Sequence, residues 1–417
     1  MFDRVVRTGN LWITDGAGET HRFGDGSGAK VAVRLAGARL EKELVLNPQL
    51  VLGEAYMHGR FIVEQGSIYD FLAIVLSNAE RYPFPKWLNS ADRLRRLTRR
   101  IQQYNPAGKA RANVAHHYDI DAQIYDLFLD HDRQYSCAYF ADGIDRADIE
   151  QAQLAKKRHI AAKLALKPGL RVLDIGSGWG GLGLYLAHTA GVDVTGITLS
   201  AEQLKFARTR ARQQGLGHAA RFELRDYRHV KETVSRPFDR IVSVGMFEHV
   251  GINHYGAFFR HVRDLLRQDG VALIHAIGRS DEPGATNPFI AKHIFPGGYI
   301  PALSEVLPAI ERSGLFVTDI EILRLHYADT LRAWRERFLA KRPQALALRG
   351  EEFCRMWEFY LAGSEAAFRY QGLMVFQIQL TRRLDALPLT RDYMADAERR
   401  LARREGEQPE TLRLAGE

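Results

Sequence analysis

Residues 171–187 read RVLDIGSGWGGLGLYLA and decide the fold class. The stretch begins with a β-prone apolar run, 171–175, that contains one acid, Asp174. Five glycines follow from Gly176 to Gly183, and an amphipathic helical pattern then begins. A strand, a glycine turn and the start of a helix form the ligand crevice of an open α/β sheet. The glycines allow positive φ and let a ligand lie against bare backbone.

The glycine spacing over 176–181 also fits the dinucleotide fingerprint G-x-G-x-x-G. That fingerprint needs an acid about 20 residues later, at the tip of the second strand, to bind the ribose. Here the tip, 198–200, reads TLS, and the nearest acid, Glu202, falls inside the next predicted helix. Asp174, just ahead of the glycines, better suits a cationic ligand without phosphates. The pattern resembles the first motif of class I methyltransferases that use S-adenosylmethionine. We favour that interpretation over a nicotinamide or flavin site, and both over a purely structural turn.

Composition sets broad limits on the protein class. The chain has 417 residues, which suggests two domains or one enlarged domain, and its longest apolar runs are too short to cross a bilayer. Because the N-terminal residues lack a signal-peptide pattern, we expect a cytoplasmic protein. Two cysteines, Cys137 and Cys354, exclude a disulfide scaffold and a cysteine-rich metal site. The net charge of +8 fits an anionic partner, either nucleic acid or acidic lipid headgroups, and fits an inert basic surface equally well.

The chain divides into four predicted regions. Residues 1–85 read as a small α+β domain, with short alternating runs expected to form antiparallel strands. Residues 86–112 form a basic linker, whose run Arg93–Arg100 fits either an amphipathic helix on an anionic membrane or a solvated linker. Residues 113–390 form the catalytic domain. Residues 391–417 are expected to be a charged, frayed tail.

The catalytic region alternates strands and helices. Strands are predicted at 171–175, 192–197, 221–225, 239–244 and 270–276. This alternation predicts a doubly wound, mostly parallel Rossmann-like sheet, with the site in the loops at the carboxyl ends of the strands. A long helical stretch is expected from Asp329 to Leu380.

Nine motifs, including part of the stretch at 171–187, occur in one order between His116 and Leu331, and they carry a family resemblance. They read HHYDI, YSCAYF, LDIGSGWGG, GITLSAEQ, DYR, FDRIVSVGMFEHVG, HAIG, IFPGGYIP and LHYADTL. Together with GEAYMHGRF at 53–61, the chain resembles the cyclopropane-fatty-acyl-phospholipid synthases over nearly its whole length. The resemblance implies transfer of a methylene group from S-adenosylmethionine to a cis double bond of a phospholipid acyl chain.

The resemblance also implies a site. The family's base is a bound bicarbonate ion, and the matching positions are Cys137, Glu248, His275, Ile277 (through its backbone) and Tyr327. The implied cofactor contacts are Tyr135 and Ser136 at the methionine end, Asp174, Gly176 and Gly178 at the glycine turn, Thr198, Leu199 and Gln203 at the ribose, and Asp226 and Tyr227 at the adenine. No metal is implied.

Three alternatives remain open at this point. The first is a methyltransferase of the same fold that methylates an unsaturated lipid without closing the ring. The complete set of bicarbonate-binding positions disfavours this alternative. A lipid-binding protein with a vestigial pocket is disfavoured by Glu248 and the glycines. A nucleic-acid methyltransferase has charge alone in its favour. The resemblance further implies an N-terminal lipid-binding domain and peripheral contact with the inner face of the cell membrane. The expected partners are unsaturated phospholipids and not nucleic acid. The resemblance also allows a homodimer.

Overall fold

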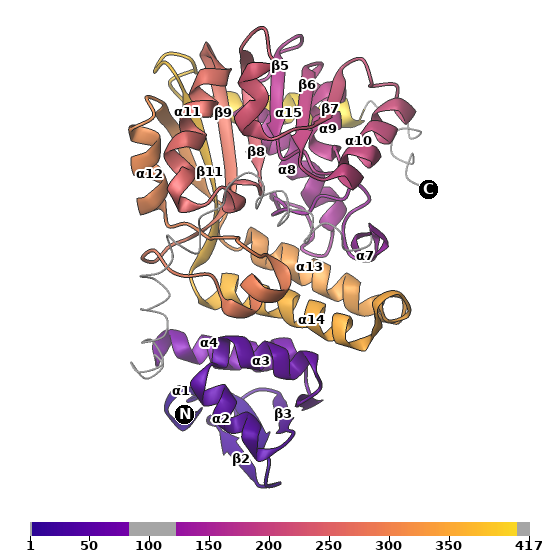
Figure 1. Cartoon of the computed structure of the whole chain (residues 1–417), viewed down its shortest axis with the longest axis vertical. Helices are drawn as coiled ribbons and strands as arrows, with labels where there is room; N and C mark the ends of the chain where they lie inside the picture. The colour runs from indigo at the N-terminus through magenta and orange to yellow at the C-terminus, as the bar shows by residue number, and fades with distance from the viewer. Residues whose placement is uncertain (1, 83–121, 407–417) are drawn as a thin grey trace. The chain divides into compact units, whose positions relative to one another are not determined.

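The computed structural model describes residues 2–82 and 122–406, which divide into two compact units (Figure 1). Unit 1 comprises residues 2–82, 284–298 and 327–373, and unit 2 comprises residues 122–283, 299–326 and 374–406. The region predicted as the catalytic domain, 113–390, therefore contributes to both units. The predicted basic linker, 86–112, and residues 113–121 lie outside the described residues.

Unit 2 is built on a seven-stranded sheet. Its strands are β5 (Arg171–Ile175), β6 (Asp193–Thr198), β7 (Ala220–Leu224), β8 (Phe238–Val244), β9 (Leu266–Arg279), β10 (Phe316–Ile322) and β11 (Leu373–Thr381). The order is β10-β11-β9-β8-β5-β6-β7. The five strands from β9 to β7 are parallel to their neighbours, and β10 pairs antiparallel with β11. The prediction of a mostly parallel α/β sheet is confirmed.

Helices cover both faces of this sheet, as Figure 1 shows. The helices of unit 2 are α7 (Ala122–Asp126), α8 (Ile149–Lys163), α9 (Gly181–Ala190), α10 (Ala201–Gln213), α11 (Tyr255–Leu265), α12 (Leu303–Glu311) and α15 (Asp392–Gly406), with the 3₁₀ helices η1 (Tyr227–Glu232), η2 (Phe247–His249) and η3 (Ile252–His254). Successive residues of β5 reach opposite cores: Val172 packs with α9, whereas Leu173 packs with α11. Because side chains alternate along a strand, a run that is buried throughout requires cover on both faces.

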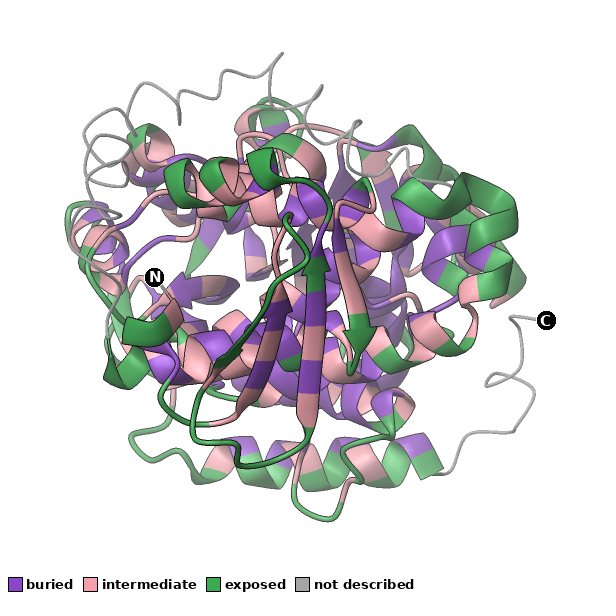
Figure 2. Ribbon diagram, turned by 90° about the horizontal axis from the view of Figure 1, so that it is seen from below, coloured by how far each residue is buried: buried purple, intermediate pink, exposed green. Residues whose placement is uncertain are grey.

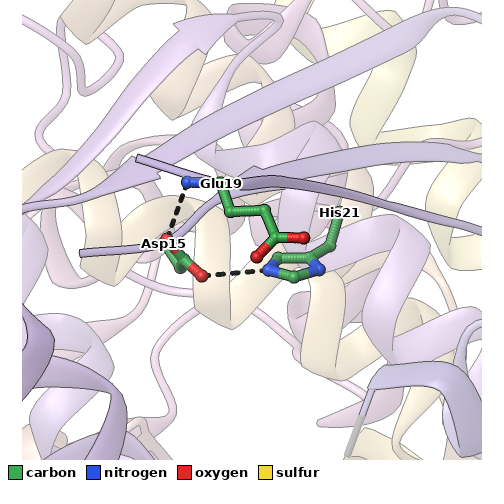
Figure 3. Close-up of side chains that lie close together, drawn as sticks. All are labelled: Asp15, Glu19 and His21. Atoms are coloured by element: carbon green, nitrogen blue, oxygen red, sulfur yellow. Dashed lines mark hydrogen bonds and ion pairs between the residues drawn. The ribbon is translucent and has the colours of Figure 1, made fainter. Parts of the chain in front are cut away.

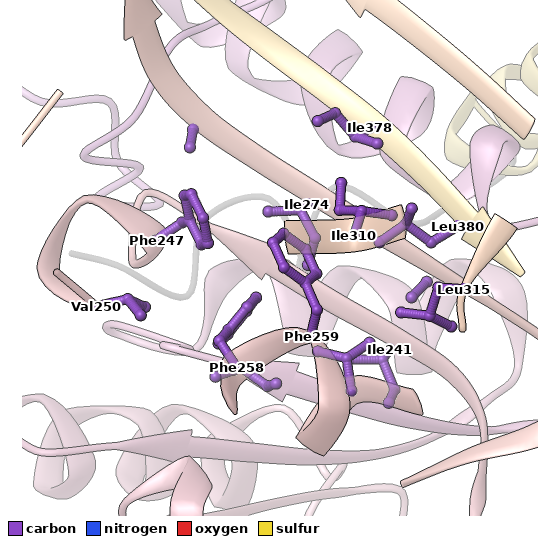
Figure 4. Packing of buried hydrophobic residues seen from close by; sticks show 14 of the residues in the cluster. Ile241, Phe247, Val250, Phe258, Phe259, Ile274, Ile310, Leu315, Ile378 and Leu380 are labelled. Carbon is purple, nitrogen blue, oxygen red and sulfur yellow. The ribbon is translucent and has the colours of Figure 1, made fainter. Parts of the chain in front are cut away.

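The core on the α11 side is rich in aromatic rings (Figure 4). Phe247 stacks on Tyr255, with ring centroids 4.5 Å apart, and contacts Phe258 and Phe259. Ile241, Ile274 and Ile378 from three neighbouring strands pack in the same cluster. The 3₁₀ helix η2 is therefore anchored by Phe247, which fixes the backbone position of its neighbour Glu248.

Unit 1 contains a four-stranded sheet and seven helices among its described residues. The elements are α1 (Phe2–Val5), β1 (Asn10–Thr14), β2 (Thr20–Phe23), β3 (Lys30–Leu35), α2 (Ala38–Leu46), α3 (Pro48–Met57), β4 (Phe61–Gln65), α4 (Ile68–Arg81), the π-helix η4 (Ile290–Ile294), α13 (His326–Ala340) and α14 (Arg342–Tyr370). Figure 2 shows how buried and more exposed residues alternate along strands, as they do in β1 and β3. This alternation is typical of a sheet with one covered face.

Three sequence-based expectations are wrong. The strands of the small sheet are not all antiparallel, since β1 pairs parallel with β3 and antiparallel with β2. The predicted helix 329–380 ends at Tyr370, and 373–381 is β11, whose buried β-prone residues pair with β10. The C-terminal tail is not frayed over 392–406, because α15 buries Met394, Ala397 and Leu401.

Within the described ranges, no helix is both long and apolar enough to span a membrane.

Candidate active site

The turn between β5 and α9 forms the floor of the site. Gly176, Gly178 and Gly180 all have positive φ, of 86°, 53° and 86°. A Cβ atom at Gly176 would also lie 2.9 Å from the Cβ atom of Met246, so a side chain is excluded there. The amides of Gly176 and Ser177 both donate to the carbonyl oxygen of Ile197 at 2.9 Å. These bonds hold the glycine turn against β6 and expose its backbone to a ligand.

A pocket in unit 2 opens over this turn. All ten residues predicted to contact the cofactor line it: Tyr135, Ser136, Asp174, Gly176, Gly178, Thr198, Leu199, Gln203, Asp226 and Tyr227. The structure thus brings together four separate stretches of sequence, 135–136, 174–178, 198–203 and 226–227, and the last three lie at the carboxyl ends of the parallel strands β5, β6 and β7. Such ends are where open α/β sheets bind ligands.

Asp174 gives the pocket a site for positive charge. Its Oδ2 atom is buried and has no hydrogen-bond partner among the described residues. Burial raises the pKa of Asp174 to about 7, while the positive charge of Lys156 acts in the opposite direction. A cationic ligand beside this carboxyl group would favour its ionised form. The chemistry of this wall therefore fits a sulfonium cofactor better than a phosphate.

The far end of the pocket presents polar and aromatic groups. The Oγ1 atom of Thr198 donates to Oε1 of Gln203 at 2.8 Å, which orders both side chains at the tip of β6. Asp226 accepts from Arg228 through both carboxylate oxygens, and although burial raises the pKa of Asp226, these bonds bring it below its usual value. Tyr227 packs edge-on against Phe258, with ring centroids 5.3 Å apart.

Glu248 is the central residue of the predicted base set. Its Oε1 atom accepts a hydrogen bond from the amide of Ile277 at 2.7 Å, and its carbonyl oxygen accepts one from the amide of Tyr299 at 3.0 Å. Its Oε2 atom is buried without a partner in the described part of the chain. Burial raises the pKa of Glu248 to about 7, and the Ile277 amide opposes that rise. The structure thus joins Glu248 to Ile277, as the resemblance implies.

His275 lies near the end of β9 and is neutral. Burial, assisted by the charges of Lys156 and Lys163, lowers its pKa to about 3. Its Nδ1 atom lies 3.1 Å from Nε2 of Gln377, an amide donor, which places the ring proton on Nε2. Its carbonyl oxygen accepts from the amide of Gly245 at 2.9 Å, which ties β9 to the loop that leads to Glu248.

The two remaining residues of the predicted base set lie elsewhere in the chain. Cys137 is a buried thiol directly after the pocket-lining pair Tyr135 and Ser136, and its Sγ donates to the carbonyl oxygen of Ala138. Tyr327 belongs to unit 1, where its ring packs against Phe368 with centroids 4.8 Å apart. Tyr327 therefore belongs to unit 1, whereas Glu248 and His275 belong to unit 2.

Sequence reasoning missed several residues of the site. Met246 and His249, on either side of Glu248, line the pocket, and burial lowers the pKa of His249 to about 4. Gln153 and Lys156 lie behind the pocket wall on α8 and are fully buried. The sequence of α8 offered one signal, because its polar residues are mixed with alanines and form no separate charged face. Such a pattern indicates that some of the polar residues are buried.

A second group of polar side chains lies in unit 1, at the hairpin of β1 and β2 (Figure 3). Asp15 accepts from the backbone amides of Ala17 and Glu19, both at 2.9 Å, and lies 3.0 Å from Nε2 of His21. These hydrogen bonds stabilise the tight turn and account for the geometry of the group. We assign no function to it.

Comparison with known proteins gives two family matches. Residues 106–378 match the family described as mycolic acid cyclopropane synthetase. Residues 10–83 match a domain of unknown function. The first match covers more than half of the chain and includes the whole of the pocket.

The proteins similar to this chain include two curated relatives and one solved structure. The cyclopropane-fatty-acyl-phospholipid synthase of Escherichia coli K12 is 37% identical over 85% of this chain and 88% of its own length. A probable fatty acid methyltransferase of Pseudomonas putida is 40% identical over 64% of this chain and 68% of its own. The mycolic acid cyclopropane synthase CmaA1, solved with SAH and CTAB, is 34% identical, with a TM-score of 0.60 over 67% of this chain and 99% of that one.

Proposed function

This chain belongs to the mycolic acid cyclopropane synthetase family, and we propose that it converts the cis double bond of an unsaturated phospholipid acyl chain into a cyclopropane ring. S-adenosylmethionine donates the added carbon, and the products are the cyclopropane acyl chain, S-adenosylhomocysteine and one proton. The observation that carries the proposal is the similarity to the E. coli synthase, which extends over 85% of this chain. The similarity therefore includes sequence outside the methyltransferase sheet.

The residues of the pocket suit a methyl donor of this kind. An alkene is a weak nucleophile, so the donor carbon must be activated, aligned with the double bond and kept from water. S-adenosylmethionine supplies an electrophilic methyl group on a sulfonium. Asp174 offers a carboxylate to this positive charge, and the bare backbone of Gly176 and Gly178 permits close approach. Tyr135 also lines the pocket, and an aromatic ring can stabilise positive charge without reacting with it.

Ring closure requires that a base removes one proton from the added methyl group. We propose that Cys137, Glu248, His275, the backbone of Ile277, and Tyr327 hold a bicarbonate ion, which would supply this base. Two features support the proposal. The Oε2 atom of Glu248 is buried without a partner in the described structure, and neutral His275 carries its proton on Nε2, from which it can donate. A group that accepts from His275 and shares a proton with Glu248 satisfies both.

The experiment that tests this function uses the full chain with S-adenosylmethionine, bicarbonate and vesicles of a cis-monounsaturated phospholipid. Acyl methyl esters are then analysed by gas chromatography and mass spectrometry, before and after hydrogenation. We expect a product heavier by one CH₂ that resists hydrogenation. Glu248→Gln is the matched variant, because its amide oxygen can still accept from Ile277. We expect it to bind cofactor and to lose ring formation at least about a hundredfold.

An open-chain product is the second candidate function. The P. putida relative is named a probable fatty acid methyltransferase, and it is 40% identical over 64% of this chain, whereas the E. coli synthase is 37% identical over 85%. A heavier product that takes up hydrogen would establish methylation without ring closure and would exclude the ring-closing role of Glu248, His275 and Tyr327. If the cofactor binds but no methylated or cyclopropanated lipid forms, both candidate functions are contradicted.

We further propose where the enzyme meets its lipid. We infer peripheral contact with the cytoplasmic face of the cell membrane, through the N-terminal domain and the basic linker, without nucleic acid as a partner. The net charge of +8 and the arginines of 93–100 support an anionic surface as the partner. We also propose a homodimer, which sedimentation of the purified chain would test.

A further inference from the structure

One wall of the cofactor pocket, residues 134–136, is fixed from behind by α8. Gln153 and Lys156 lie three residues apart, hence on one face of the helix, and both are fully buried. The Nε2 atom of Gln153 donates to the carbonyl oxygens of Gln134 and Ser136 at 3.2 and 3.0 Å. The Nζ atom of Lys156 donates to Oε1 of Gln134 at 2.7 Å and to Oγ of Ser136 at 2.8 Å. Four hydrogen bonds therefore fix both the backbone and the side chains of this wall.

The charge of Lys156 has no carboxylate as a direct partner in these bonds, since both acceptors are neutral oxygens. The neighbouring Lys157, in contrast, pairs with Asp132 at 2.5 Å. A buried ammonium group is costly unless it is paired, so a lysine kept on neutral acceptors behind a ligand pocket points to a functional need. Because Gln134 and Ser136 both line the pocket, that need concerns the ligand.

The ionisable groups around Lys156 come from several elements: Asp130 and Asp132 in the loop before the wall, Cys137 after it, Lys157 on α8, Asp174 at the end of β5 and His275 on β9. Burial lowers the pKa of Lys156 to about 8, and the charge of Asp130 opposes this. In turn, the charge of Lys156 lowers the pKa of Asp174, which burial alone would raise further.

We propose that Lys156 is a positioning residue of the cofactor pocket, which holds the side chains of Gln134 and Ser136 in the wall that faces the sulfonium cofactor. The inference rests on the proposed function, since it takes S-adenosylmethionine as the ligand. Without Lys156, Oε1 of Gln134 and Oγ of Ser136 lose a charged donor, and Asp174 becomes easier to protonate.

The test measures S-adenosylmethionine binding to the full chain by calorimetry at a series of pH values. The affinity of the unmodified protein should rise with pH through about 7, because Asp174 ionises in that range. We expect Lys156→Met to bind about tenfold more weakly and its pH midpoint to move upward, because the charge that favours ionised Asp174 is gone. Lys157→Met is the matched control on the same helix. It should lower thermal stability through loss of the Asp132 pair but leave the pH midpoint in place.

The outcomes separate this inference from the proposed function. If the unmodified chain does not bind S-adenosylmethionine, the proposed function is wrong, and the inference falls with it. A folded Lys156→Met variant with unchanged affinity and midpoint would overturn the positioning role alone, and so would an equal shift in Lys157→Met. If Lys156→Met does not fold, Lys156→Gln replaces it, because glutamine keeps a donor but no charge. An unshifted midpoint in Lys156→Gln would also overturn the inference.

Discussion

Glu248 is held by the Ile277 amide through one carboxylate oxygen, while burial raises its pKa to about 7. Because its pKa lies above the ordinary value of 4.5, the group is protonated below about pH 7 and ionised above it. In the proposed function Glu248 shares a proton with the bicarbonate ion that acts as the base, and a protonated Glu248 cannot take up that proton. With cofactor saturating and bicarbonate fixed, kcat should therefore rise about tenfold per pH unit below the pKa of Glu248 and level off above it.

The matched measurement separates Glu248 from Asp174, whose pKa burial also raises to about 7. Asp174 affects cofactor affinity, so its titration should appear in the dissociation constant and disappear from kcat at saturation. The residual kcat of Glu248→Gln should show no step near pH 7. A step of unchanged size in that variant would mean that another group controls the chemical step.

The residues of the cofactor pocket were accessible from sequence because each belongs to a short motif. Gly176 and Gly178 follow a strand within one turn, and Thr198 marks the tip of the next strand. Lys156 and Gln153 were not accessible, since their partners lie 17–22 residues earlier in the chain and only the packing of α8 brings them together. A buried lysine on a helix cannot be distinguished from an exposed one by residue type alone.

At the level of elements, the parallel strands were predictable because each is a buried β-prone run followed by a polar loop. The strand β11 was missed because it follows α14 directly, and its run of apolar residues reads equally well as the continuation of a buried helix. The helix α15 was overlooked because charge dominates its composition. Its apolar residues Met394, Ala397 and Leu401 nevertheless recur at helical spacing, which was a usable signal.

A buried carboxylate near the end of the helix α15 links it to α8 and α9. Glu405 accepts from Arg158 of α8 and, at 2.6 Å, from the hydroxyl of Tyr185 of α9. Glu405→Ala removes both contacts and leaves Tyr185 buried without this acceptor. We expect the variant to lose roughly 2 kcal/mol of unfolding free energy, because removal of one partner leaves the others desolvated. The measurement is the urea midpoint at unchanged m-value.

Asp396→Ala, on the same helix, is the control for this prediction. Its partner Arg399 is 65% exposed and Asp396 itself is 53% exposed. An exposed ion pair contributes little, so we expect a change within about 0.5 kcal/mol. Equal losses in the two variants would mean that α15 is held by its apolar residues alone and that Glu405 has no special part.

At the scale of the whole molecule, the chain carries 58 basic against 50 acidic side chains, and this excess suits an anionic lipid surface. The run Arg93–Arg100, outside the described residues, holds five of the arginines with apolar residues between them. In the proposed function this run lies near the headgroups. Binding to vesicles should therefore require anionic lipid and weaken with salt, because exposed charges are screened.

Reversal of three of these arginines to glutamate, at Arg95, Arg96 and Arg99, tests the location of the contact. Each basic residue near an anionic membrane contributes about 1 kcal/mol, so loss of three should weaken vesicle binding at least about a hundredfold. The control variant changes Arg399, Arg400 and Arg403, which are exposed on α15, to glutamate. Three such reversals lower the net charge from +8 to +2, so both variants carry the same net charge. Flotation with phosphatidylglycerol vesicles measures both variants. Since net charge is matched, a loss confined to the first variant would place the membrane contact at the linker, whereas equal losses would mean that overall charge, and not this segment, attracts the enzyme to lipid.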